Sequence, residues 1–322
     1  MTRSDFNWFA ASGVERLEPL RKDKAWVRER LGDSATRIAP LWRHRNLVFD
    51  DRPALLTPGE LEPIAHHVTT YMLLGEVDGT IVFAADLDRD QERVGEHLAA
   101  FGDLSDLREM AGRLQRSEAA WLAHARGLAF WHQTHQFCGS CGSATEATDA
   151  GHVRACTSAD CGKQHFPRTD PAVIVLTEHD HKCLLGRNRG WTNGLYSTLA
   201  GFVEPGESLE DAVRREIFEE SAVRVGAVHY HSSQPWPFPA SVMLGFFGEA
   251  LTHDITVDEH ELADARWFTR EEILNAAAFG PQVSGLRLPR EISIARKLLD
   301  EWYGRAGESL DDAIARVRSA DQ

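Results

Sequence analysis

Residues 201–223 read GFVEPGESLEDAVRREIFEESAV, and the rest of the chain is best interpreted outward from this stretch. It opens with a loop that contains the turn residues Pro205 and Gly206. Ser208 is followed three positions later by an acidic residue, an arrangement typical of the start of a helix. The pattern therefore predicts a helix that runs from Ser208 to about Ser221.

One face of this predicted helix starts apolar and ends in carboxylates. The residues at helical spacing on that face, with Glu219 at its edge, are Leu209, Val213, Glu216 and Glu220. A surface helix would place its carboxylates opposite the apolar side, whereas here they continue it. Inward-facing carboxylates repel one another unless a cation joins them, and Mg²⁺ or Mn²⁺ suits oxygen ligands. We therefore expect a divalent metal site in which Arg215 pairs with and orients one carboxylate.

The same residues resemble the signature of the Nudix hydrolases, G-x5-E-x7-R-E-U-x-E-E-x-G-U, where U is a bulky aliphatic residue. The matching residues are Gly201, Glu207, Arg215, Glu216, Ile217, Glu219, Glu220 and Val223. Ala222 replaces the final glycine, so a left-handed backbone at the helix exit would carry a cost. The resemblance implies hydrolysis of a nucleoside diphosphate linked to another moiety. The catalytic residues that it implies are Arg215, Glu216, Glu219 and Glu220.

Composition limits the broad class of the protein. A chain of 322 residues exceeds one typical hydrophobic core, and 43% hydrophobic content with 26% charged residues is ordinary for a globular protein. The formal net charge of −14 argues against indiscriminate adhesion to nucleic acid. The first residues lack the apolar core of a signal peptide, and no apolar run is long enough to cross a bilayer. We expect a cytoplasmic protein that does not associate with a membrane.

A second constellation involves four of the five cysteines: Cys138, Cys141, Cys156 and Cys161. The first pair forms a tight knuckle, and four thiolates match a closed, structural Zn²⁺ site. Because the second pair has four intervening residues, His165 remains an alternative to Cys156 or Cys161, and free thiols without metal remain the other interpretation. Cys183 lies in the predicted strand 182–186 and is expected to be a small buried apolar residue.

A proline-rich motif follows the predicted helix. Residues 233–241 read SQPWPFPAS and match the pattern SQPWPFPxS, which marks the NADH pyrophosphatase branch of the Nudix family. Three alternate prolines favour an extended backbone that presents Trp236 and Phe238 to a nucleobase or a nicotinamide ring. In the alternative interpretation these aromatic rings pack in the core. The expected substrate-binding residues are Phe166, Phe202, Ser233, Gln234, Trp236, Phe238 and Ser241.

The resemblance to this branch implies a specific reaction, in which NAD(H) and water give nicotinamide mononucleotide and AMP. It implies that Glu216, Glu219 and Glu220 hold Mg²⁺ or Mn²⁺ together with a further carboxylate from a downstream loop. Glu261 matches that position, and Glu259 is the nearby alternative. Members of the branch work as homodimers, and some remove NAD caps from the 5′ ends of RNA. NAD(H) and NAD-capped RNA are therefore the expected partners.

The expected fold is α/β, a Nudix α/β/α sandwich preceded by a zinc ribbon and an N-terminal α+β domain. We predict an N-terminal Nudix-like domain with linking helices at residues 1–133 and a zinc ribbon at 134–168. The catalytic domain follows at 169–305, and a polar, mobile tail at 306–322. Asp78-Gly79 predicts a hairpin, and residues 105–132 predict a helix broken near Ser117.

Two other functions remain open. Another Nudix pyrophosphatase, acting on ADP-ribose or another nucleoside diphosphate derivative, would share the carboxylates but lack the motif at 233–241. A non-catalytic nucleotide-binding or RNA-binding protein with an inactive signature would have no need of metal ligands. The complete set of Glu216, Glu219 and Glu220 argues against this second alternative.

Overall fold

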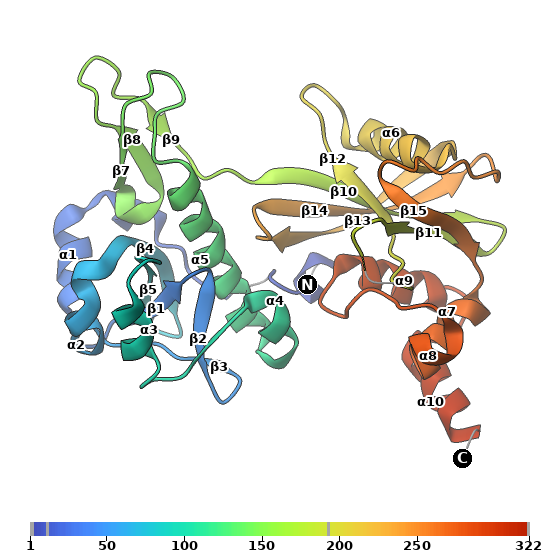
Figure 1. Ribbon diagram of the computed structural model, residues 1–322, viewed down its shortest axis with the longest axis horizontal. Coiled ribbons are helices and arrows are strands. Elements are labelled where there is room, and N and C mark those ends of the chain that lie inside the picture. Colours follow the sequence, from blue (N-terminus) through green and yellow to red (C-terminus); the bar gives the residue numbers. More distant parts are fainter. Residues whose placement is uncertain (1–2, 11–12, 192–193, 321–322) are drawn as a thin grey trace. The chain divides into compact units, whose positions relative to one another are not determined.

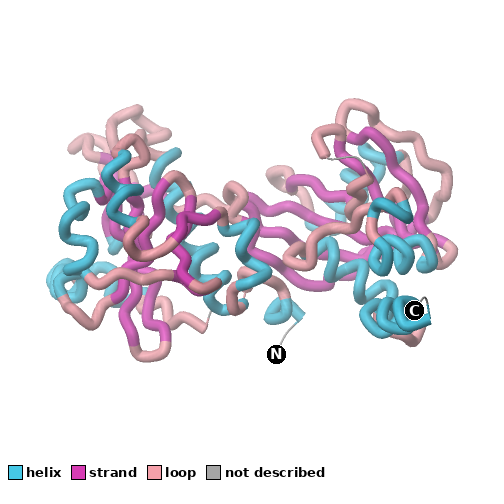
Figure 2. The backbone as a smooth tube through the Cα atoms, turned by 60° about the horizontal axis from the view of Figure 1, so that its bottom comes forward, coloured by secondary structure: helices cyan, strands magenta, loops and turns pink. Residues whose placement is uncertain are grey.

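A computed structural model describes residues 3–10, 13–191 and 194–320 (Figure 1). The chain forms two compact units. The N-terminal unit comprises residues 8–169 and 235–241, and the C-terminal unit comprises residues 1–7, 170–234 and 242–322. Both units contain strands and helices (Figure 2). Within the described ranges, no helix has the length and apolar character needed to span a membrane.

The N-terminal unit is built on a six-stranded sheet of order β3-β2-β1-β5-β4, in which β6 pairs with β2. Its strands are β1 (Arg37–Trp42), β2 (Arg45–Phe49), β3 (Arg52–Pro53), β4 (Val68–Val77), β5 (Thr80–Leu87) and β6 (Asp103–Ser105). β1 and β5 run parallel, whereas β4 and β5 form the predicted antiparallel hairpin, closed by the pair Val77↔Thr80. Asp78 and Gly79 both have positive φ, 48° and 78°, as a tight two-residue hairpin loop requires.

Helices surround this sheet: α1 (Lys24–Gly32), α2 (Pro58–Leu61), α3 (Glu92–Leu98), α4 (Leu107–Met110) and α5 (Arg116–Thr134). The predicted break in the helix at 105–132 exists, and it lies between the short turn Ala111–Arg113 and α5. Gln115 and Glu118 form a capping box there, which starts α5 as a separate helix. α5 then buries Trp121 and Trp131 against the sheet and leads into the cysteine-rich segment.

That segment forms a small three-stranded antiparallel sheet of order β7-β8-β9. Its strands are β7 (Thr145–Thr148), β8 (Val153–Cys156) and β9 (Gln164–His165). The first knuckle precedes β7 and the second lies between β8 and β9, so the two loops approach one another. This arrangement is that of a ribbon with cysteines at one end.

The C-terminal unit is built on a six-stranded sheet of order β13-β14-β10-β11-β15, in which β12 pairs with β10. Its strands are β10 (Asp170–His179), β11 (Lys182–Asn188), β12 (Leu199–Phe202), β13 (Val225–Trp236), β14 (Ser241–Ala250) and β15 (Leu262–Phe268). Successive residues of β10 face opposite sides of the sheet. Val173 therefore packs in one core and Ile174 in the other.

Helices cover both sides of this sheet (Figure 1). α6 (Leu209–Ser221) packs on the side of Val173, and α7 (Arg270–Phe279) and α9 (Ile294–Gly304) pack on the side of Ile174. A short helix, α8 (Pro281–Ser284), joins α7 to the segment before α9. The predicted α/β/α sandwich is confirmed.

The segment after residue 305 differs from the expected mobile tail. Residues 310–320 form a helix, α10 (Leu310–Ala320), which is capped by Ser309 through its bond from the Asp312 amide, 3.1 Å. Leu310 and Ala313 are buried in the same core as Trp302. The tail is rich in charged residues, so its few apolar residues did not suggest a packed helix. Their helical spacing places them on one face, which packs against this core.

The first residues of the chain belong to the C-terminal unit. The Asn7 side-chain amide donates to Ser232 Oγ at 2.9 Å and to the Ser233 carbonyl at 2.8 Å. Ser4 Oγ accepts from the Ser233 backbone N–H at 3.0 Å. Asn7 and Ser232 are both buried, so this contact covers the end of β13.

Candidate functional site

The signature arginine joins the loop before α6 to the helix itself. Arg215 Nε and Nη2 donate to the two carboxylate oxygens of Glu207, both at 2.8 Å. Nη2 also donates to the Phe202 carbonyl at 2.9 Å. Nη1 donates to Glu216 at 2.9 Å and to Glu219 at 3.0 Å. These bonds fix two of the expected metal ligands relative to the loop, which makes Arg215 a positioning residue.

The electrostatics of this network follow from its geometry. The hydrogen bonds from Arg215 hold the pKa of the Glu207 carboxyl at about 2, and the same contacts raise the pKa of Arg215. The pair therefore stays ionised at neutral pH. Glu207 thus has a role in the site that the sequence did not predict, although it occupies a position of the signature.

The backbone of β12 approaches the helix closely at Gly201. A β-carbon on this residue would lie 1.9 Å from the carboxylate carbon of Glu216 and 2.0 and 2.2 Å from its oxygens. Gly201 pairs with Val173 of β10, so the sheet fixes its position. The glycine of the signature is therefore required by the space that the Glu216 carboxylate occupies.

The carboxylates differ in their exposure to solvent. Glu220 is buried, with 6% of its surface exposed, whereas the Glu219 side chain is 56% exposed. Burial, together with the nearby carboxylates of Glu216, Glu261 and Asp258, raises the pKa of Glu220 to about 8. Burial also raises the pKa of Glu216, although Arg215 opposes this effect. Carboxyl groups are thus concentrated at the C-terminal half of α6.

A loop before β15 brings further acidic residues to the end of α6. The Thr256 amide donates to the Ser221 carbonyl at 2.9 Å, and the Asp258 amide donates to the Glu220 carbonyl at 3.1 Å. Glu261, which was predicted from the sequence, follows in the same loop. The charge of its carboxylate raises the pKa of both Glu216 and Glu220. The Asp258 side chain joins this cluster without having been predicted. The acidic run that starts at Asp258 was the only signal in the sequence for it.

Glu259, the alternative to Glu261, offers its backbone carbonyl to Arg189 Nη1, and the Arg189 amide donates to the Glu261 carbonyl at 3.4 Å. Arg189 therefore ties this loop to the end of β11. The donor set around α6 consists of carboxylate oxygens, which suits a hard divalent cation. Such a cation would relieve the repulsion among Glu216, Glu220 and Glu261.

The predicted substrate-binding residues of the C-terminal unit have different environments. The Phe202 side chain is 58% exposed, next to Gly201. Gln234 is 1% exposed, and its amide donates to the Ile292 carbonyl and accepts from the Ile294 amide, both at 2.8 Å. In this structure Gln234 therefore braces the start of α9. The substrate-binding assignments of both residues, and of Ser233, stay predictions.

The remaining predicted residues lie in the N-terminal unit. The Trp236 and Phe238 rings meet edge to face, with their centroids 5.1 Å apart. The centroid of the Phe9 ring lies 6.0 Å from that of Trp236 and 5.6 Å from that of Phe238. The Arg108 guanidinium lies 4.6 Å from the Phe238 ring centroid. The backbone is extended as far as Trp236 and then turns before β14, so only the first half of the motif has the expected conformation.

The first residue of β14 is Ser241, and Phe166, directly after β9, is 65% exposed. Because Trp236 and Phe238 are partly buried against each other and against Phe9, the structure has the aromatic packing of the alternative interpretation. Roles of these four residues in substrate binding remain predictions.

The four clustered cysteines converge in the ribbon. Their sulfur atoms all lie within 4.8 Å of one another, with Cys138 to Cys161 at 3.8 Å and Cys141 to Cys156 at 3.4 Å. His165 Nε2 lies 3.3 Å from the sulfur of Cys138. Four sulfur ligands at this separation fit a tetrahedral metal site. Cys183 is fully buried in β11, as expected, and burial raises the pKa of its thiol.

Comparison with known families assigns all three parts of the chain. Residues 167–285 match the NUDIX domain, and residues 35–131 match the NADH pyrophosphatase-like rudimentary NUDIX domain. Residues 133–166 match the NADH pyrophosphatase zinc ribbon domain. These matches cover the carboxylate site, the sheet of the N-terminal unit and the cysteine cluster.

Individual relatives agree with these matches. The NAD-capped RNA hydrolase of Schizosaccharomyces pombe is 34% identical over 353 aligned positions, which cover 92% of this chain and 93% of that protein. NAD-capped RNA hydrolase NudC of Stutzerimonas stutzeri is 35% identical over 261 positions, 81% of this chain and 87% of that protein. NAD-capped RNA hydrolase NUDT12 of Homo sapiens is 43% identical over 198 positions, 59% of this chain.

The chain belongs to the Nudix hydrolase family. Its rudimentary NUDIX domain and zinc ribbon place it in the NADH pyrophosphatase branch of that family. The chain spans 43% of the length of the human NUDT12 protein.

Proposed function

We propose that this protein is a metal-dependent pyrophosphohydrolase that cleaves NAD(H) to nicotinamide mononucleotide and AMP and removes NAD caps from RNA. The observation that carries the proposal is the carboxylate cluster of α6 and its downstream loop, organised by Arg215. The names of the relatives support the choice of an NAD-type substrate.

The residues of the chain have distinct roles in this proposal. Glu216, Glu219, Glu220 and Glu261 hold the divalent cation, Mg²⁺ or Mn²⁺. When bound, that cation supplies charge neutralisation at the diphosphate and a water of lowered pKa. Arg215 orients two of the carboxylates through hydrogen bonds of 2.9 and 3.0 Å. The exposed ring of Phe202 offers a face for stacking against the nicotinamide.

Structural zinc, a cytoplasmic location and a homodimer complete the proposal. The four converging sulfurs support zinc, held by Cys138, Cys141, Cys156 and Cys161. All five cysteines are free, which is typical of a reducing compartment. The homodimer rests on resemblance to the branch, and light scattering of the purified chain tests it.

Product analysis tests the proposed activity. The full chain is incubated with Mn²⁺ and, separately, with NADH, NAD⁺, an NAD-capped RNA and ADP-ribose. We expect AMP and a nicotinamide mononucleotide from the first two substrates and RNA with a 5′ monophosphate from the third. Faster cleavage of ADP-ribose than of all three would favour the other Nudix activity. No cleavage of any substrate, by protein that binds NAD(H), would favour a non-catalytic binding role.

A further inference from the structure

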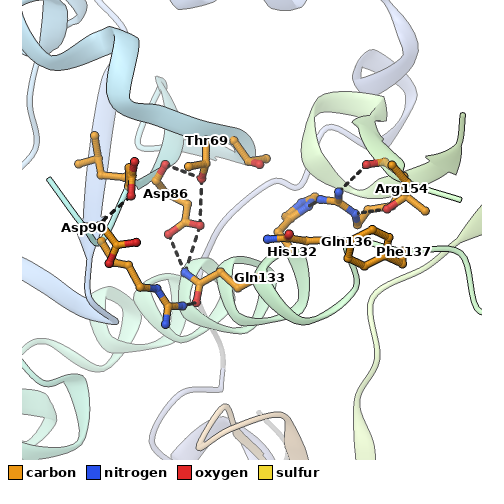
Figure 3. A pocket seen from close by; sticks show the side chains of 14 residues that line it. Thr69, Asp86, Asp90, His132, Gln133, Gln136, Phe137 and Arg154 are labelled. Atoms are coloured by element: carbon orange, nitrogen blue, oxygen red, sulfur yellow. Dashed lines mark hydrogen bonds between the residues drawn. The ribbon is translucent and has the colours of Figure 1, made fainter. Parts of the chain in front are cut away.

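The N-terminal unit contains a cavity of about 580 Å³ that the carboxylate site does not use (Figure 3). It is lined by the ends of β4 and β5, the C-terminal end of α5 and the beginning of the ribbon. Its volume is in the range of pockets that enclose small organic molecules. The residues on which the following argument depends are Asp86, Asp90, His132, Gln133, Phe137 and Arg154.

Arg154 places a buried positive charge in the cavity wall. It is 8% exposed, and its three hydrogen bonds all go to neutral acceptors. Nε and Nη2 donate to the hydroxyl and the carbonyl of Thr145, both at 2.7 Å, and Nη1 donates to His132 Nδ1 at 2.9 Å. His132 accepts as a neutral ring, because its Nε2 donates to the Gly151 carbonyl at 2.8 Å.

This arrangement leaves Arg154 without a counter-charge. Over the described ranges, no carboxylate forms an ion pair with it. Buried charges in proteins are normally paired, and a guanidinium has five N–H groups, of which three are used here. The two that remain suit two oxygens of one oxyanion. Arg154 thus indicates that the ligand of this cavity is an anion.

An exposed aromatic ring lies at the same end of the cavity. Phe137 is 68% exposed and pairs with Ala144, the neighbour of the Thr145 that holds Arg154. Figure 3 shows Phe137, His132 and Arg154 together at this end. A large apolar ring at the rim of a polar cavity is suited to stack on a planar ring of a ligand.

The opposite end of the cavity carries Asp86 and Asp90 together with Arg89, whose Nη2 donates to Gln133 Oε1 at 2.6 Å (Figure 3). Asp86 is 4% exposed and accepts hydrogen bonds from Gln133 Nε2, 2.9 and 3.1 Å, and from Thr69 Oγ1, 3.1 Å. Asp90 is exposed at the rim. These carboxylates can accept hydrogen bonds from hydroxyl or amino groups. The cavity therefore combines an anion site, an aromatic face and an end that accepts donors.

We propose that this cavity binds a nucleoside monophosphate. The phosphate lies on Arg154, the base stacks on Phe137, and hydroxyl or amino groups face Asp86 and Asp90. This class of ligand carries an oxyanion, a planar ring and several donors in one molecule. The site is separate from the metal-binding carboxylates, so the proposal does not depend on the catalytic assignment.

Hydrogen exchange of the full chain locates the ligand. AMP, adenosine and inorganic phosphate are compared as probes, without added Mg²⁺ or Mn²⁺. We expect AMP to slow exchange in peptides that cover residues 132–137 and 145–154. Adenosine and phosphate should each need at least about tenfold higher concentration, since each lacks one of the contacts. Protection confined to residues 201–223, or equal effects of phosphate and AMP, would overturn the proposal.

Two variants test the contacts. Phe137→Ala should weaken AMP binding at this cavity by about tenfold, because base stacking on an aromatic ring is lost. Phe49→Ala removes another exposed phenylalanine of the same unit and should leave binding unchanged. Arg154→Lys keeps the charge and loses the planar fork, so binding should again fall by about tenfold. The proposal would be contradicted if Phe137→Ala, Arg154→Lys, the control Phe49→Ala and the wild type all bound AMP with equal affinity and unfolded at the same temperature.

Discussion

The carboxylate of Glu216 fills the space that a β-carbon on residue 201 would need. The clash distance of 1.9 Å is far shorter than any contact that a folded protein tolerates. The atoms involved are the flexible end of a glutamate, so the side chain can move away at little cost. The strand and the helix are fixed by their cores, and the carboxylate is the part that must yield.

We predict that Gly201→Ala leaves the fold intact and lowers kcat/KM by about a hundredfold, because the Glu216 carboxylate is displaced from its place in the metal site. Thermal unfolding and steady-state hydrolysis of NADH measure the two effects. Gly304→Ala is the matched control, since nothing lies within 4 Å of a β-carbon there. Full activity of Gly201→Ala would show that Glu216 has no role at its observed position.

We predict that Glu219→Gln removes most turnover without unfolding the protein. This carboxylate is exposed and bonded to Arg215, so an amide of equal size keeps the packing but loses a metal ligand or base. The loss should be about a hundredfold or more. Glu210→Gln, on the first turn of the same helix, controls for a change of charge. Near-normal turnover under saturating Mn²⁺ would refute the assignment.

We predict that Ala222→Gly stabilises the protein by about 1 kcal/mol. Ala222 ends α6 in a left-handed conformation, φ 59° and ψ 8°, which glycine adopts without the penalty of a β-carbon. Ala315→Gly, at an exposed position inside α10, should do the opposite by a similar amount. Chemical denaturation of both variants measures the change. A loss of stability in Ala222→Gly would contradict this account of the helix exit.

We predict one zinc ion per chain in protein purified without added metal. Cys161→Ser should lose the zinc, because four sulfurs complete the tetrahedron. His165→Ala should retain it, since the imidazole contacts the sulfur of Cys138 from outside this group. Elemental analysis of the two variants decides between these residues. Zinc that depends on His165 and survives the loss of Cys161 would change the ligand set.

We predict that Asp86 makes stability depend on pH. In the folded protein the pKa of this carboxyl is raised to about 6, chiefly by burial and slightly by the charge of Asp88. The hydrogen bonds from Gln133 and Thr69 and the nearby charge of Arg89 oppose this rise. In the unfolded chain the carboxyl ionises near its ordinary pKa of 3.8. The free energy of unfolding should therefore fall between about pH 4 and pH 6, by about 3 kcal/mol in all, and stay low above that range.

Comparison with a variant isolates this effect from other titrations. Asp86→Asn cannot ionise, so its stability relative to the wild type should rise between pH 4 and pH 7. Asp90→Asn, which changes an exposed carboxyl of the same segment, should show no such trend. Denaturant unfolding at several pH values gives the differences. Parallel pH profiles for Asp86→Asn and the wild type would contradict the prediction.

The site on α6 could be predicted because its information is local. Helical spacing places Glu216 and Glu220 on one face whatever the rest of the fold, and Ser208 marks the start of the helix. The position of Glu261 could also be predicted, from resemblance to the family. Asp258 lies in the cluster because backbone hydrogen bonds join the loop before β15 to the end of α6. The spacing of residues along the sequence does not reveal these bonds.

Other features depend on contacts between distant segments. The isolated buried cation of Arg154 arises because β8 packs on the end of α5, and neither segment alone shows this. The packing of Trp236 against Phe9 joins residues far apart in the chain. α10 was missed for another reason, since its few apolar residues are diluted by charged ones. Long-range packing, more than local propensity, limits what this sequence predicts.

The bonds between Asn7 and the end of β13 have a consequence for the synthesis of this protein. The partners are 225 positions apart, so Asn7 cannot reach its final place until Ser232 has also left the ribosome. The N-terminal unit, almost all of which lies between them, can fold in the meantime. A fragment that starts at residue 170 would contain the signature helix but leave Ser232 uncovered. Such a fragment is expected to be less stable than the same unit in the intact chain.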